Sequence, residues 1–314
     1  MARRVVLFYR DFQRFTGGHL KVWDYFNHVA ASPDAEPRIA FSSRTVWDST
    51  NPWLKRKDAV TEWSPQAADL LFLGGMDWRA LPASQRKSFS KPIINLIQHP
   101  RHAEAGSELR SFLAHRATRI CVSEEVAAAI NATNEVNGPV HVIANGIDSS
   151  CLPGRPKSLA ERTTDLLICG LKAPELARDC YRHLSGKQGV VRWMIDWAPR
   201  EEFLRRMADA RVVLLLPRRE EGFYLPALEA MGSGSVVVCP DCIGNRSFCL
   251  DGANSFRPEY DLDKIIAAAE RALHLEPSAQ TGLLEGARAT VQQHTLENER
   301  FKFLPILAQT GRSL

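Results

Sequence analysis

The hydrophobic pattern of the chain alternates between short apolar runs and longer stretches with helical periodicity. The apolar runs have the length and the Val, Ile and Leu content of buried parallel strands. They occupy residues 5–9, 38–41, 68–74, 92–97, 117–122, 165–170, 190–196, 212–216 and 235–239. Helical periodicity covers residues 104–115, 199–210, 226–231, 264–273, 278–293 and 296–309. This alternation predicts an α/β fold with parallel sheets.

A break in the pattern divides the chain. Residues 149–164 contain Pro, Gly, Ser and charged residues without periodicity, which is typical of a linker. The strand–helix alternation resumes at residue 165. We therefore predict two α/β domains of ordinary size, with a boundary near residue 150.

The clearest strand–loop–helix–strand unit lies between the apolar runs at 212–216 and 235–239. A polar turn follows the first run, and Pro226 is well placed at the first position of the next helix. Gly232 and Gly234 end that helix. Ligands of open α/β sheets gather where strand ends meet helix starts, and the N–H groups of a helix start favour an anion such as a diphosphate.

Two carboxylates belong to this unit. Glu221 is in the loop at the strand end, and Glu229 is inside the helix. Acids beside a diphosphate site suit hydroxyl-rich groups, such as a sugar and a ribose. Taken singly, each acid is better interpreted as an ordinary residue, Glu221 as a loop acid and Glu229 as a solvated helix residue.

The whole segment 221–238 resembles the Glu-x7-Glu signature of retaining glycosyltransferases with the GT-B fold, in particular the large family four. That family typically reads E-G-F-G-L-P-x-L-E-A-M-A-x-G-x-P-V-V, and this chain reads E-G-F-Y-L-P-A-L-E-A-M-G-S-G-S-V-V-V. A looser similarity covers residues 90–148. The resemblance implies two Rossmann-like domains whose parallel sheets face each other across a cleft. Residues 1–150 would form the acceptor side, joined by a C-terminal helix at 297–314, and residues 151–296 the donor side.

The resemblance also implies roles for residues of the second domain. Glu229 would bind the donor ribose, and Glu221 would bind hydroxyls of the donor sugar. The backbone that holds the diphosphate would come from Gly222, Phe223, Tyr224 and Leu225. Lys172 would neutralise the leaving diphosphate, because a cation at developing negative charge is the main electrostatic aid to such a reaction.

Further candidates follow other predicted strands. His99 comes after the strand at 92–97, where family members carry a histidine near the donor sugar, and His102 is a weaker candidate toward the acceptor. Gly17 and Gly18 allow close backbone approach to a phosphate or substrate, although a tight turn needs the same residues. Trp197 either walls the nucleotide base or packs against the helix that follows it.

The chain departs from the family pattern in three places. Leu171 occupies the position of an arginine that often faces the diphosphate. An acid that usually precedes the D-G-x-N turn is missing, with Asn245 and Arg246 in its neighbourhood. Tyr224 replaces the second glycine of the signature. These departures leave a non-catalytic sugar-nucleotide- or glycan-binding protein on the same fold as an alternative.

Composition narrows the classes of function. The chain is 45% hydrophobic and 24% charged with a net charge of +4, which gives no case for nucleic acid as a partner. No apolar run approaches membrane-spanning length, the start lacks a signal-peptide core, and an odd number of cysteines favours reduced thiols. We therefore expect a cytoplasmic protein. Arg110, Arg116 and Arg119 are interpreted as a solvated face, with weak peripheral contact at the inner face of the membrane as the alternative.

No metal and no cofactor are expected. The triplet Asp261-Leu262-Asp263 resembles a metal motif of a different glycosyltransferase fold, but it precedes a predicted helix, so N-capping explains it better.

The expected activity is retaining transfer of a sugar from a UDP- or GDP-linked donor to a hydroxyl of a glycan, a lipid or a small molecule. No residue stands out as a covalent nucleophile, so the resemblance implies front-face attack assisted by the diphosphate. A sugar-nucleotide epimerase or hydrolase is a second enzymatic alternative.

Overall fold

The computed structural model describes residues 3–152, 157–186 and 189–310. They form two compact units, one reaching Asn145 and resuming at Glu297, the other running from Gly146 to Leu296. The expected linker at 149–164 is part of the second unit, and its residues 153–156 lie outside the described ranges, as do residues 311–314 of the expected C-terminal helix. Among the helices in these ranges, none is long and apolar enough to cross a membrane.

The first unit is built on six parallel strands in the order β2-β1-β3-β4-β5-β6. The strands are β1 (Arg4–Arg10), β2 (Ala35–Phe41), β3 (Leu70–Gly74), β4 (Ile93–Ile97), β5 (Thr118–Cys121) and β6 (Val140–Val142). Phe8 of β1 pairs with Ile39 of β2 and with Phe72 of β3, which fixes the register at the centre. Because all pairs are parallel, the carboxyl ends of the strands share one edge of the sheet.

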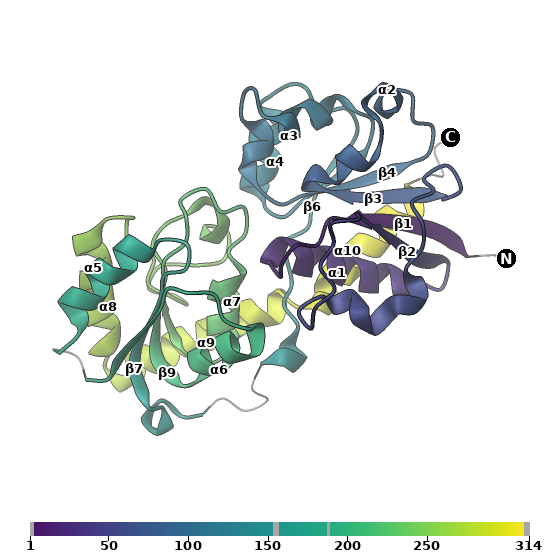
Figure 1. Ribbon diagram of the computed structural model, residues 1–314. Helices are drawn as coiled ribbons and strands as arrows, with labels where there is room; N and C mark the ends of the chain where they lie inside the picture. The colour runs from purple at the N-terminus through teal and green to yellow at the C-terminus, as the bar shows by residue number, and fades with distance from the viewer. Residues whose placement is uncertain (1–2, 153–156, 187–188, 311–314) are drawn as a thin grey trace. The chain divides into compact units, whose positions relative to one another are not determined.

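Short helices and 3-10 turns connect these strands. They are α1 (Gly17–Ala30), α2 (Ala83–Arg86), α3 (Glu108–Ser111), α4 (Glu124–Asn131), α10 (Leu296–Gln309), η1 (Pro52–Ala59), η2 (Gly75–Ala80), η3 (Pro100–Ala103) and η4 (Phe112–Ala114). Helices α1 and α10 lie on one face of the sheet, and α3 and α4 lie on the other (Figure 1). The alternation of side chains along β1 explains this division, because Phe8 packs toward α1 while Leu7 belongs to the core on the opposite face.

A buried ion network fastens α10 to α1. The Lys21 ammonium lies 2.6 Å from Glu299 and 2.8 Å from Asp24, and His28 lies 3.1 Å from the other oxygen of Glu299. Burial disfavours the Lys21 cation, but Glu299 and Asp24 outweigh that effect and raise its pKa. The C-terminal helix is therefore held in the first unit by charge as well as by apolar packing.

The second unit contains four parallel strands in the order β10-β9-β7-β8. Its strands are β7 (Thr164–Cys169), β8 (Val191–Met194), β9 (Ala210–Leu215) and β10 (Val236–Val238). Its helices and turns are α5 (Pro174–Leu184), α6 (Arg200–Ala208), α7 (Leu225–Gly232), α8 (Leu262–Leu273), α9 (Pro277–Gln293), η5 (Ser149–Cys151), η6 (Leu159–Glu161) and η7 (Ile243–Asn245). Helices α5 and α8 cover one face of this sheet, and α6 and α7 cover the other (Figure 1).

The predicted strands are confirmed, and so are several helix starts. The Ser123 hydroxyl accepts a hydrogen bond from the Val126 amide at the start of α4. The Asp261 carboxylate caps α8 by accepting from two amides, which confirms N-capping for this acidic triplet. The prediction of one helix over residues 104–115 is wrong. Gly106 adopts a left-handed conformation with φ +74°, and only the short α3 and η4 follow it.

The interpretation of Arg119 as part of a solvated face is also wrong. Arg119 is fully buried, and its guanidinium donates to the Asn95 side chain at 2.8 Å and to backbone carbonyls of the turn after α3. Burial lowers its pKa to about 10. Of the other two arginines, Arg110 pairs with Glu135 and Arg116 is exposed.

The ion network makes a testable prediction. Replacing Glu299 with Ala leaves Lys21 buried without its closest anion, so we expect the free energy of unfolding to fall by about 3–5 kcal/mol. Glu297→Ala changes an exposed acid in the same helix turn and should cost less than about 1 kcal/mol. Urea unfolding monitored by circular dichroism measures both. Equal midpoints for the two variants would contradict a stabilising role of the network.

Candidate functional site

Lys172 and Glu221 meet at the carboxyl edge of the second sheet. Strands β7 and β9 are neighbours, with Cys169 paired to Leu215, so the turns that follow them lie side by side. The Lys172 ammonium is 2.9 Å from Oε1 of Glu221, whose side chain is mostly buried. The two predicted residues therefore form one ion pair.

Glu229 pairs with an arginine that sequence reasoning missed. Arg200 begins α6, and its Nη1 lies 2.5 Å from Oε1 of Glu229. The Glu229 side chain is only 3% exposed, so its interpretation as a solvated helix residue is wrong. Although the guanidinium is close, Oε1 accepts no directed hydrogen bond from the described residues. A buried carboxylate oxygen with unused acceptor capacity is typical of a position that binds a ligand hydroxyl.

The backbone of the loop between these acids is partly occupied. The Tyr224 amide donates to the Gly244 carbonyl at 2.9 Å, and the Leu225 amide donates to the Phe223 carbonyl at 3.2 Å. Pro226, next in α7, has no N–H group. The amides of Gly222 and Phe223 donate no hydrogen bond within the described part of the chain. These two amides, and not those of Tyr224 and Leu225, lack a hydrogen-bond acceptor within the described residues.

The η7 turn packs closely against this loop. A Cβ added to Gly244 would lie 2.7 Å from the Glu221 carbonyl and 2.7 Å from the Phe223 nitrogen, so only glycine fits there. The Asn245 side chain closes the turn by accepting from the Cys242 amide at 3.1 Å. Asn245 thus has a structural part near the position where the family has an acid. Arg246 is paired with Asp241 at 2.6 Å.

Two apolar side chains at this edge are exposed to solvent. Leu171, in the position of the family's arginine, is 53% exposed, and Trp197, between β8 and α6, is 51% exposed. Trp197 makes no aromatic contact with another described ring. About half of its surface is therefore open to solvent, and contact with a nucleotide base stays a prediction.

The predicted residues of the first unit lie at the carboxyl edge of its sheet. Gly17 and Gly18 begin α1, and the Gln98 side chain donates to the Gly18 carbonyl at 3.2 Å. His99 directly follows Gln98, and its Nδ1 accepts from the Arg101 amide at 3.1 Å. His102 is buried, and burial lowers its pKa to about 3, so it is uncharged and offers no accessible group to an acceptor.

A polar cluster at the same edge was not predicted. The Arg10 guanidinium lies 2.7 Å from Asp77 and 3.0 Å from Nδ1 of His19. Burial raises the pKa of Asp77 to about 6, although Arg10 acts in the opposite direction. Burial and then Arg10 lower the pKa of His19 to about 3, so its neutral Nδ1 accepts from Arg10. The cluster can present a neutral imidazole and a guanidinium to hydroxyl-rich or anionic groups.

Comparison with solved structures defines the class of fold. Sucrose-phosphate synthase from Thermosynechococcus elongatus has a TM-score of 0.74 at 13% identity, covering 98% of this chain and 99% of its own. Anabaena Alr3699/HepE in complex with UDP-glucose has a TM-score of 0.74 at 14% identity, covering 97% and 99%. A trehalose 6-phosphate synthase from Burkholderia multivorans has a TM-score of 0.68 at 13% identity, covering 98% and 97%. The chain therefore has the GT-B fold.

The family is indicated by the second unit. Residues 155–274 match the model of the family described as "Glycosyl transferases group 1". No curated protein has a sequence that matches this chain. The second unit thus matches a group 1 glycosyltransferase domain, and the predicted resemblance to glycosyltransferases with the GT-B fold is confirmed.

The tight packing around Gly244 leads to a second prediction. Gly244→Ala forces the new methyl group against the Glu221 loop, so we expect a loss of about 1–3 kcal/mol in stability. Gly282→Ala places a methyl group in open space within α9 and should stabilise by about 0.5–1 kcal/mol. Thermal unfolding of both variants is the measurement. An unfolding midpoint of Gly244→Ala equal to that of the parent chain would show that Gly244 is not tightly packed against the Glu221 loop.

Proposed function

We propose that this protein is a retaining glycosyltransferase that moves a sugar from a nucleotide diphosphate sugar to an acceptor hydroxyl. The observation that carries the proposal is the pair of acid–cation contacts at the carboxyl edge of the second sheet, Lys172–Glu221 and Arg200–Glu229. Both acids lie within residues 155–274, which match the family model. Each contact places a carboxylate, which can accept hydrogen bonds from hydroxyl groups, beside a cation that can bind phosphate.

In this proposal the donor ribose binds to Glu229. Its hydroxyls would donate to the carboxylate oxygen that has no directed hydrogen bond, and Arg200 would be released toward the diphosphate. Arg200 would then supply the second cation that Leu171 cannot. Trp197 offers an open aromatic face to the nucleotide base.

The transfer itself needs charge stabilisation at the leaving group. The bond from the anomeric carbon to the diphosphate oxygen breaks, and the acceptor oxygen forms its bond on the same face of the sugar. The acceptor proton passes to the departing phosphate oxygen. Lys172, Arg200 and the amides of Gly222 and Phe223 would stabilise the diphosphate, so the proposal requires no metal ion. Glu221 would hold hydroxyls of the transferred sugar.

The first unit would bind the acceptor. His99, the α1 start at Gly17 and Gly18, and the Arg10–His19 contact offer hydrogen-bond donors at one sheet edge. Such groups suit a glycan, a lipid-linked sugar or a small polyol. A UDP-linked donor is favoured because the similar Anabaena Alr3699/HepE was solved in complex with UDP-glucose.

A cytoplasmic location belongs to the same proposal. All seven cysteines are unpaired, and burial raises the pKa of thiols such as Cys169 and Cys242 to about 12, which makes them unreactive. Reduced thiols are typical of proteins inside the cell.

A non-catalytic sugar-nucleotide-binding protein is the second candidate. The exposed Leu171 favours it, because an apolar side chain replaces a cation that otherwise faces the diphosphate. Binding of a nucleotide sugar without any transfer product would support this candidate.

Glu221 tests the catalytic proposal. The intact protein is incubated with UDP-glucose, other UDP sugars or GDP-mannose and a panel of sugar acceptors, and mass spectrometry detects the glycosylated product. Because Glu221 would hold the reacting sugar, Glu221→Gln should lower the rate by a factor on the order of 100 or more. Nucleotide binding should persist in that variant. Glu220→Gln, at an exposed neighbouring acid, is the matched control and should keep the full rate. Full transfer activity in Glu221→Gln would contradict the proposed role of Glu221.

A further inference from the structure

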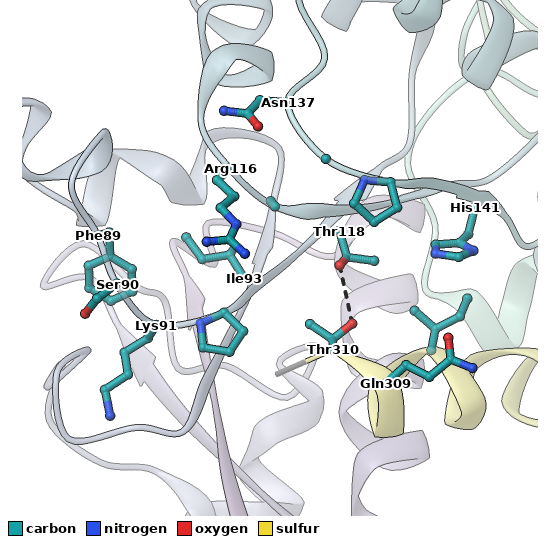
Figure 2. A pocket seen from close by; sticks show the side chains of 15 residues that line it. Phe89, Ser90, Lys91, Ile93, Arg116, Thr118, Asn137, His141, Gln309 and Thr310 are labelled. Atoms are coloured by element: carbon teal, nitrogen blue, oxygen red, sulfur yellow. Dashed lines mark hydrogen bonds between the residues drawn. The ribbon is translucent and has the colours of Figure 1, made fainter. Parts of the chain in front are cut away.

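The first unit contains a pocket of about 380 Å³ at the sheet edge opposite to His99 and the α1 start. Segments that lead into β4, β5 and β6 line it, together with the last turn of α10 (Figure 2). Its volume is within the range of pockets that hold small organic ligands, which begins at about 300 Å³. Because the strands are parallel, a pocket at their amino ends does not belong to the candidate site at their carboxyl ends.

The two charged residues of this pocket, Lys91 and Arg116, are both cations. Lys91, Arg116 and His141 line it, and the lining contains no Asp or Glu. Within the described part of the chain, none of these three side chains has a hydrogen bond or an ion pair. Two other arginines of the same unit do have an acidic partner, since Arg79 pairs with Glu108 and Arg110 pairs with Glu135. The pocket therefore concentrates unpaired positive charge.

Neutral hydrogen-bonding groups lie among the cations. The Thr310 hydroxyl bonds to that of Thr118 at 3.4 Å on the floor of the pocket. The Asn137 amide nitrogen donates to the Ala114 carbonyl, so its oxygen is the group left for a ligand. At the end of α10 the Thr310 carbonyl, which would repel an anion, accepts from Arg4 at 2.9 Å. Figure 2 shows Arg116 above Ile93, with Lys91 and His141 at opposite ends of the group.

The walls of the pocket are set by packed residues. Ile93 is buried in the sheet, and Ile306 belongs to α10, which the Glu299 network holds in place. Gly138 has φ +120°, and a Cβ there would lie 2.2 Å from the Ala117 carbonyl. The loop before β6 is thus pressed against the start of β5. The shape is built into the fold and does not depend on exposed side chains alone.

We propose that this pocket binds a small phosphate monoester that carries hydroxyl groups. Arg116 and Lys91 would contact the phosphate, because guanidinium and ammonium groups form strong charge-assisted hydrogen bonds with it. Thr118, Thr310 and Asn137 would bond to hydroxyls of the ligand. The phosphate can belong to a soluble metabolite or to a lipid headgroup, since both offer the same dianionic group. This second site is separate from the proposed transferase site.

Calorimetric titration of the intact protein with glycerol 3-phosphate and with inorganic phosphate tests the proposal. UDP is present throughout, so that phosphate groups of the probe do not enter the donor site. We expect Arg116→Glu to weaken glycerol 3-phosphate binding about tenfold or more, because it replaces a charged hydrogen-bond donor with an anion. Lys57→Glu makes the same charge change at an exposed residue outside the pocket and should leave binding unchanged. Arg116→Gln provides a milder variant with the same expected direction.

Vesicles distinguish the two sources of phosphate. Flotation with phosphatidylcholine vesicles, with and without phosphatidic acid, is measured for the same variants. Binding of phosphatidic acid vesicles that depends on Arg116, without binding of the soluble probes, assigns the phosphate to a lipid. The proposal is overturned if neither source binds at millimolar phosphate or if Arg116→Glu binds as tightly as the parent chain. Loss of transfer activity plays no part in this test, so its failure is distinct from failure of the transferase proposal.

Discussion

The parallel order of the strands is the constraint on which the rest of the second unit depends. With β7, β8, β9 and β10 all running one way, every turn at their carboxyl ends opens at one edge. Lys172 follows β7, Arg200 begins the helix after β8, and Glu221 follows β9. Residues far apart in the sequence therefore meet as two acid–cation pairs. The order of the strands brings the cations to the acids, and the chemistry of a sugar nucleotide suits that arrangement.

The two pairs differ in their surroundings. Lys172 is largely solvated, so its attraction to Glu221 is screened by water and stabilises the fold little. Glu229 is buried, and its carboxylate is costly to keep without compensation. Arg200 compensates its charge, yet one carboxylate oxygen keeps acceptor capacity. A ligand hydroxyl that donates a hydrogen bond to that oxygen would use its remaining acceptor capacity. In the proposed function, burial of Glu229 would therefore connect the stability of α7 with nucleotide recognition.

Much of the architecture could be predicted because the short apolar runs and the glycine and proline stops act locally. The two motif acids and Lys172 could also be placed, since each directly follows a recognisable strand or lies in the motif. Arg200 could not be predicted as a site residue, because its sequence position is that of an ordinary first residue of a helix. Only the packing of α6 beside α7 brings it to Glu229. Arg10, His19 and Asp77 were missed for the same reason. Arg119 was wrongly interpreted as solvated, because burial of a guanidinium among backbone carbonyls leaves no trace in sequence periodicity.

The contact between Glu229 and the donor ribose is the central claim, and a ligand–protein cycle tests it most directly. Calorimetry measures the affinity of the parent chain and of Glu229→Gln for UDP and for 2′-deoxy-UDP, with the GDP pair in parallel. Removing a hydroxyl bonded to a carboxylate should weaken binding to the parent chain about tenfold or more, and Glu229→Gln should discriminate much less between the two ligands. Equal discrimination by both proteins, or no binding of either nucleotide by the parent chain, would contradict the account.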